Sequence, residues 1–217
     1  MANPSSAPGT IVVSGTGRVA VEPDVADLRL GVAMARPTVD AARADAATAM
    51  SAILASIKGA GVTATDIRTT LVSVQPRYDY RDGKAPLLTG YELANTVEVT
   101  IRDLATLGGV IDGSLTAGAT SMDGLSFRLD DPTDAERAAR LAAMAQARAR
   151  ADTLAEAAGV VIAGVGEVVE GGSGGGPWYP QPKAARMMLA SDMATPVEGG
   201  TTEISVSVTV TYRLAQI

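Results

Sequence analysis

The sequence predicts an α+β fold, an antiparallel-rich sheet built from hairpins with two long helices packed on it. Strands are indicated by runs in which apolar and polar residues alternate with a period of two. Helices are indicated over about 38–58 and 132–158, where apolar residues recur at spacings of three and four. The elements come in mixed order, not in strict β-α alternation, which favours α+β over α/β.

The first two strands are expected within residues 11–34, where two alternating runs flank a turn at 22–24 and predict a β-hairpin. Gly15 and Gly17 lie inside the first run. A dinucleotide-binding loop needs glycines that open a helix, whereas these lie in a continuing strand. We interpret them as glycines that permit a bulge or a close backbone approach.

The first long helix is expected to follow Thr38, a suitable N-cap, and to end at residues 59–61. Its apolar stripe is Val39, Ala42, Ala46, Met50, Ile53 and Ile57. A second hairpin is expected from residues 67–80 and 88–102, with Asp82 and Gly83 near its tip. Asp103 is expected to cap a short helix. Phe127, the single phenylalanine, is assigned to a strand and to the core.

The second long helix follows Asp131 and is expected to end at Gly159. Its inner stripe is predicted to be Ala135, Ala138, Ala142, Ala145 and Ala149. Such small side chains let a helix lie close to its sheet, or leave a pocket between them. Asp130, Asp131 and Asp134 are interpreted as helix-capping carboxylates, because they lack the spacing of a hard-cation site.

The last strands are expected over 160–170 and 201–214. The latter has the most regular alternation in the chain, with Ile204, Val206, Val208, Val210 and Tyr212 on one face. Residues 1–9 are expected to form a flexible N-terminal arm, and 10–217 a single domain with a long Gly/Pro-rich insertion at 171–200.

Composition limits the chemistry. The chain has no His and no Cys, which excludes a Ser-His-Asp triad, a thiolate nucleophile and a Cys-ligated zinc site. We therefore predict no enzyme activity, no cofactor and no metal. The net charge of −6 weighs against a nucleic-acid partner, because a phosphate backbone needs a basic face.

Neither a signal peptide nor a transmembrane segment is visible in the sequence. A cytoplasmic location is expected as the sequence stands. The alternative is a periplasmic or cell-envelope location, if a leader has been removed.

Two loops carry candidate contacts with other proteins. Tyr78 and Tyr80 lie near the tip of the second hairpin, where they are either surface packing or partner contacts. The 171–200 segment either packs on a neighbouring subunit or partner, or folds back on its own domain. Its candidate contact residues are Trp178, Tyr179, Met187, Met188, Leu189 and Met193.

The ordered set of motifs resembles the SIMPL-domain family, which includes YggE-like and periplasmic immunogenic proteins. The matching stretches begin with VSGTGRVAVEPDVADLRLGV, DIRTTLVSVQPRYDY and GYELANTVEVTIRDL, and end with TPVEGGTTEISVSVTVTYRL. The resemblance implies an α+β fold, large ring- or channel-like homo-oligomers, and a link to oxidative or envelope stress. It brings no catalytic residues.

We therefore expect a non-enzymatic binding or assembly protein that forms a large homo-oligomer, with a relation to stress. Other protein partners are left unidentified. The alternative is a small-molecule or lipid-binding protein that uses a pocket between the Ala-rich helix and the sheet.

Overall fold

The computed structural model describes residues 9–81, 85–171 and 195–215, which belong to two compact units. Unit 1 contains described residues 9–22, 131–171 and 200–215. Unit 2 contains described residues 23–81, 85–130 and 195–199. Both units lie within the range that was predicted as one domain, and each has its own sheet.

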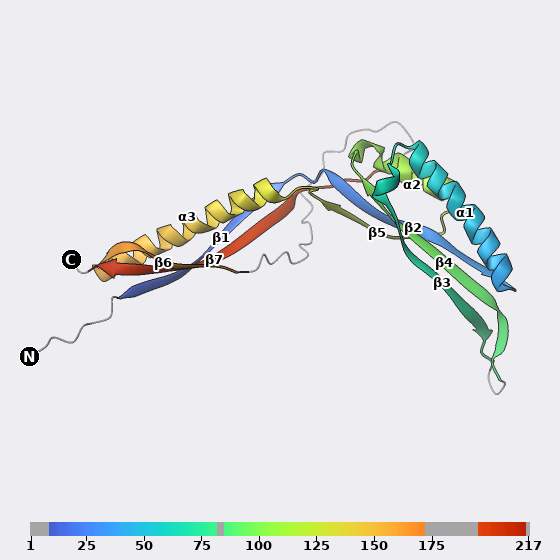
Figure 1. The fold of residues 1–217 in the computed structure, drawn as a ribbon, viewed down its shortest axis with the longest axis horizontal. Helices are drawn as coiled ribbons and strands as arrows, with labels where there is room; N and C mark the ends of the chain where they lie inside the picture. Colours follow the sequence, from blue (N-terminus) through green and yellow to red (C-terminus); the bar gives the residue numbers. More distant parts are fainter. Residues whose placement is uncertain (1–8, 82–84, 172–194, 216–217) are drawn as a thin grey trace, which may run out of the picture. The chain divides into compact units, whose positions relative to one another are not determined.

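Unit 1 is a three-stranded antiparallel sheet in the order β1-β7-β6, with one long helix on one face. Its elements are β1 (Thr10–Val21), α3 (Thr133–Ala158), β6 (Val161–Gly171) and β7 (Thr202–Ala215). Figure 1 shows α3 running lengthwise along the sheet. The buried face of β7 carries Val206, Val208, Val210 and Tyr212, which confirms the predicted alternation.

Unit 2 is a four-stranded antiparallel sheet in the order β3-β4-β2-β5, with α1 packed across β2 and β4 (Figure 1). Its main elements are β2 (Val25–Arg36), α1 (Val39–Gly59), β3 (Ile67–Asp79), β4 (Leu87–Ile101), α2 (Leu107–Thr116) and β5 (Ser121–Arg128). Short 3-10 turns, η1 (Ala64–Asp66) and η2 (Leu104–Thr106), precede β3 and α2. The predicted α+β class is confirmed, and each long helix covers a different sheet.

The predicted first hairpin is wrong, although both of its strands exist. β1 pairs with β7, while β2 pairs with β4 and β5, so the two strands belong to different sheets. The boundary between the units falls between Glu22 and Pro23, inside the predicted turn. Alternation shows that a strand has one buried face, but not which strand is its neighbour.

The predicted alanine stripe of α3 is also wrong. The side chains that face the sheet are Ala139, Ala143, Ala147, Ala151 and Ala155, whereas Ala138, Ala142, Ala145 and Ala149 are exposed. An alanine-rich helix offers alanines on several faces, so spacing alone does not identify the face that packs.

Gly15 and Gly17 explain how α3 is seated, and their predicted role in a close backbone approach is confirmed. A Cβ at Gly17 would overlap the carbonyl oxygen of Ala139 and lie 2.6 Å from the backbone nitrogen of Ala143. A Cβ at Gly15 would meet the Ala143 carbonyl in the same way. Helix and strand backbones therefore touch at these two glycines, and no cavity separates them there. A pocket of about 390 Å³ lies beside this contact, lined by residues of β1 and of the C-terminal half of α3. The alternative of a ligand pocket between the Ala-rich helix and the sheet stays a prediction.

The helix of unit 2 follows its predicted pattern closely. Thr38 caps α1, since its Oγ1 accepts a hydrogen bond from the backbone nitrogen of Ala41 at 3.3 Å. The buried stripe is Ala42, Ala46, Met50, Ile53 and Ile57, as predicted, while Val39 is 39% exposed. Phe127 is partly buried and packs against this core.

The capping roles predicted for the three carboxylates hold only for Asp131, whose Oδ1 accepts from the backbone nitrogen of Thr133 at 2.9 Å. Asp130 instead forms ion pairs with two arginines, and Asp134 pairs with Arg137 at 3.4 Å. Gly159 ends α3 with a φ of +67°, as expected for a left-handed C-cap.

Candidate functional site: the exposed β3–β4 hairpin

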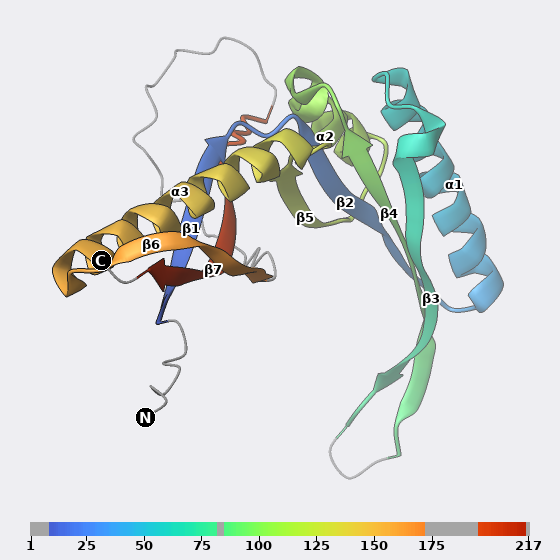
Figure 2. The same ribbon diagram turned by 60° about the vertical axis from the view of Figure 1, so that its left-hand side comes forward.

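The second predicted hairpin is confirmed and extends beyond the rest of its sheet. β3 and β4 pair antiparallel from Ile67 opposite Val99 to Asp79 opposite Leu87. The β2 partner of β4 ends where Arg36 meets Tyr91, so the distal part of the hairpin is a two-stranded ribbon (Figure 2). Such a ribbon is marginally stable alone in water.

This hairpin carries a group of large apolar side chains exposed to solvent. They are Leu71, Val72, Val74, Tyr78, Tyr80, Leu87 and Leu88. Tyr80 is 77% exposed and Val72 is 63% exposed. The helix α1 packs mainly on β2 and β4, and β3 is the edge strand of the sheet beside them. We call these seven residues the hairpin patch.

Two of the predicted contact residues, Tyr78 and Tyr80, belong to the hairpin patch, and their ring centroids are 6.3 Å apart. Trp178, Tyr179, Met187, Met188, Leu189 and Met193 lie outside the described residues and stay predictions. Sequence reasoning missed Leu71, Val72 and Val74. The signal was the uncharged, β-prone run at 69–75, which is typical of a strand able to pair with another chain.

The open face of the same sheet carries an ionic network. Glu98 accepts from Arg68 at 2.7 Å and from Arg29 at 3.1 Å. Asp27 accepts from the guanidinium of Arg128 at 2.7 Å and from the hydroxyl of Thr100 at 2.8 Å. These contacts neutralise one another, so the face presents no large region of one charge.

The network shifts the pKa values of its carboxyl groups. Partial burial raises the pKa of Asp27, but the hydrogen bonds from Arg128 and Thr100 outweigh it and lower the pKa below the ordinary 3.8. Hydrogen bonds from Arg29 and Arg68 lower the pKa of Glu98 below 4.5.

Acid should therefore destabilise unit 2. The carboxyl group of Asp27 has a lower pKa in the folded protein than in the unfolded chain. Its contribution to the stability of the fold is therefore fully present above the unfolded pKa, and it is lost as the pH falls below about 4. Asp27→Asn should be less stable than the wild type at pH 7 and should lose less stability between pH 5 and pH 3. Thermal unfolding across that range measures this difference, and parallel curves for the two proteins would contradict it.

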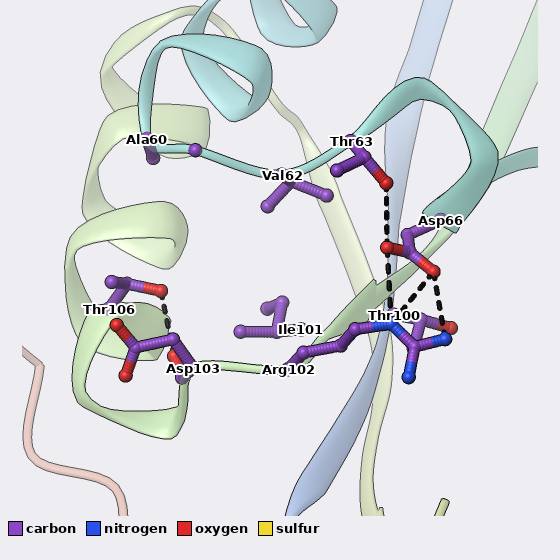
Figure 3. Close-up of a pocket in the computed structure, with 10 residues that line it drawn as sticks. Ala60, Val62, Thr63, Asp66, Thr100, Ile101, Arg102, Asp103 and Thr106 are labelled. Carbon is purple, nitrogen blue, oxygen red and sulfur yellow. Dashed lines mark hydrogen bonds and ion pairs between the residues drawn. The ribbon is translucent and has the colours of Figure 1, made fainter.

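A pocket of about 200 Å³ lies between the end of α1 and the start of η2 (Figure 3). Its polar groups are engaged with each other: Asp66 accepts from Thr63 at 2.7 Å and from Arg102 at 3.2 Å. Asp103 uses its carboxylate to cap Ala105 at 3.1 Å. The polar side chains that line the pocket therefore hold the surrounding turns together, and the pocket supports no particular ligand.

Two features are missing from the described part of the chain. Within it, no group of three or more His, Cys, Asp or Glu side chains could hold a metal ion. None of its helices is long and apolar enough to cross a membrane.

Comparison with known proteins identifies the family. The family model SIMPL, described as a protein of unknown function (DUF541), matches residues 11–212. The chain is 36% identical to the 26 kDa periplasmic immunogenic protein of Brucella melitensis biotype 1, over 95% of this chain and 85% of that protein. It is 34% identical to the uncharacterized protein YggE of Escherichia coli strain K12, over 67% of this chain and 58% of that protein. The chain thus belongs to the SIMPL family, as the order of its motifs predicted.

Proposed function

We propose that this chain is a non-enzymatic assembly protein that binds other copies of itself through the hairpin patch. The observation that carries the proposal is the exposure of seven large apolar side chains on one hairpin. Large apolar side chains that gather exposed on one element favour an interaction site in a folded protein. The absence of His and Cys from the chain also supports a binding role over a catalytic one.

The energetics favour a protein surface as the occupant. Full burial of one such side chain contributes about 1.5–3 kcal/mol. Association costs on the order of 4–15 kcal/mol in lost freedom of motion. Binding must therefore bury several side chains of the patch at once. The surface of a second protein is large enough to do this, whereas a small ligand is not.

A double substitution on the ribbon tests the proposal. Tyr78→Ser with Tyr80→Ser removes two aromatic anchors from solvent-exposed positions, so the fold should persist while self-association weakens at least tenfold. Native mass spectrometry and light scattering at micromolar concentration measure the change. Leu141→Ser is the matched control, because Leu141 is 67% exposed on α3, outside the patch. A wild-type protein that is monomeric under these conditions would overturn the proposal.

We also propose a periplasmic location and a relation to envelope or oxidative stress. The name of the Brucella relative supports the location, whereas no comparison supports the cytoplasmic expectation. The protein should be released from source cells by osmotic shock together with periplasmic marker enzymes. Retention with cytoplasmic markers would contradict the location. Peroxide sensitivity of a deletion strain tests the relation to stress.

A further inference from the structure

A pocket of about 390 Å³ lies in unit 1, where α3 runs along β1 (Figure 1). It is lined by Val13, Ser14, Arg150, Thr153 and Leu154, and we call it the α3–β1 pocket. Its volume falls within the range of about 300–1,000 Å³ that is usual for small-molecule sites. The hairpin patch belongs to unit 2, so the two sites are separate.

The α3–β1 pocket forms where the close contact between helix and strand ends. Gly15 and Gly17 let the two backbones touch, because neither residue has a side chain. Val13 is the next residue on the same face of β1, and it is buried. Its side chain keeps the helix further from the strand than a glycine does, so space opens beside the C-terminal half of α3.

Most of the wall of the α3–β1 pocket is apolar. Val13 is only 8% exposed, and Leu154 is 49% exposed. The hydroxyl group of Thr153 donates to the backbone oxygen of Ala149 at 3.0 Å, so this donor is already used within the helix. A bound molecule would therefore meet carbon atoms over much of its surface, together with one cation, Arg150.

The charge of Arg150 distinguishes it from the other arginines of α3. Arg137, Arg140 and Arg148 each pair with a carboxylate three or four positions away along the helix. At the corresponding distances from Arg150 the chain has no acidic residue, since these positions hold Gln146, Ala147, Thr153 and Leu154. Within the described residues, Arg150 forms no ion pair, so no carboxylate there neutralises its charge.

One hydrogen bond fixes the guanidinium of Arg150 at the pocket. Its Nη1 donates to the backbone oxygen of Ser14 at 2.6 Å. A guanidinium has five N–H donors, so several remain for a ligand. The N–H and C=O of one residue in an antiparallel strand point to the same side, so the N–H of Ser14 faces the same edge. Two donor groups and one positive charge suit a carboxylate, which has two acceptor oxygens and a single negative charge.

The exposure of Arg150 determines what else the ligand needs. An exposed ion pair contributes little to affinity because water screens it, and Arg150 is exposed. A small anion such as acetate would therefore bind weakly. Burial of a hydrocarbon chain against the apolar wall adds a larger favourable contribution. The pocket thus favours a molecule that combines a carboxylate with an apolar chain.

We propose that the α3–β1 pocket binds a small amphiphilic carboxylate, such as a medium-chain fatty acid. Its carboxylate accepts hydrogen bonds from Arg150, and its chain lies against Val13 and Leu154. The site goes beyond the proposed assembly through the hairpin patch and does not depend on it. The small-molecule alternative predicted from the sequence thereby acquires a location and a ligand class.

A series of carboxylates tests the ligand class. Isothermal titration calorimetry of the full chain compares acetate, hexanoate, octanoate and decanoate at concentrations below micelle formation. Affinity should rise about fourfold for each CH2 group that the pocket buries, and acetate should show no binding. Decyltrimethylammonium has the same chain length as decanoate but a positive head, and it should bind at least tenfold more weakly. Equal affinity for these two amphiphiles would overturn the proposed recognition by Arg150.

Substitutions in the pocket test the assigned contacts. Arg150→Gln removes the charge and keeps an amide donor, and decanoate affinity should fall about three- to fivefold. Leu154→Asn makes the wall polar at similar size and should lower affinity about fivefold. Arg148→Gln is the matched control, because it removes the same charge two residues away, outside the pocket. Equal losses from the two arginine substitutions would show that only net charge matters and would overturn the site.

Nuclear magnetic resonance locates the ligand on the wild type, so the test stands even if a variant fails to fold. Decanoate should shift the backbone amide of Ser14 and the methyl groups of Val13 and Leu154. The methyl groups of Leu141, which is 67% exposed elsewhere on α3, should not shift. Absence of binding, or shifts confined to Leu141 or the hairpin patch, would overturn the inference. Pocket signals that change on dilution of ligand-free protein would identify a second copy as the occupant and would overturn it too.

Discussion

Gly17→Ala should unfold α3 or expel it from its sheet, at a cost of about 3 kcal/mol in the stability of unit 1. The added Cβ would overlap the backbone oxygen of Ala139, and backbone atoms in a helix cannot rotate away as a side chain can. Hydrogen exchange with mass spectrometry should show lost protection in β1 and α3. The amides of α1 report on unit 2 in the same experiment.

Gly164→Ala is the matched control, since it adds the same methyl group to a strand glycine of the same sheet. The nearest atom to its Cβ is Nη2 of Arg213 at 3.9 Å, an ordinary contact. Its stability should remain within about 1 kcal/mol of the wild type. Equal effects of the two substitutions would show that close helix–strand contact is not what Gly17 provides.

Ile53→Ala should destabilise unit 2 by about 2–5 kcal/mol. Ile53 has no exposed surface and packs in the cluster that joins α1 to β2 and β4, so its removal leaves a cavity. Urea unfolding monitored by circular dichroism measures the loss. Val39→Ala, at a position that is 39% exposed at the start of the same helix, should cost less than about 1 kcal/mol. Similar costs for both variants would contradict the assigned core.

We place the proposed binding surface on the hairpin because the other faces of the two sheets already have packing or ionic partners. The packed faces of both sheets are filled by α1 and α3, and the ionic network satisfies the charged groups that it contains on the open face of unit 2. The hairpin patch is different, because its apolar side chains remain 40–77% exposed. We propose a partner for this surface, because apolar side chains left exposed add little to the stability of the monomer.

Local pattern alone predicted much of this protein. Thr38 capping α1, the stripe through Ile53, the end of α3 at Gly159 and the alternating face of β7 depend on neighbours in the sequence, so periodicity and capping chemistry reveal them. The exposed Tyr78 and Tyr80 also followed from their position near a hairpin tip. The ordered motifs were sufficient to identify the family.

Tertiary structure decided which elements meet. Strand alternation is the same whether β1 pairs with β2 or with β7, because register and partner depend on contacts distant in the sequence. The sequence did not show which face of α3 packs on the sheet, because the helix has alanines on several faces. The contact between Gly17 and the α3 backbone identifies that face, and this contact is known only from the structure. The exposure of Val72 likewise depends on β3 being an edge strand beyond the cover of α1, which sequence does not show.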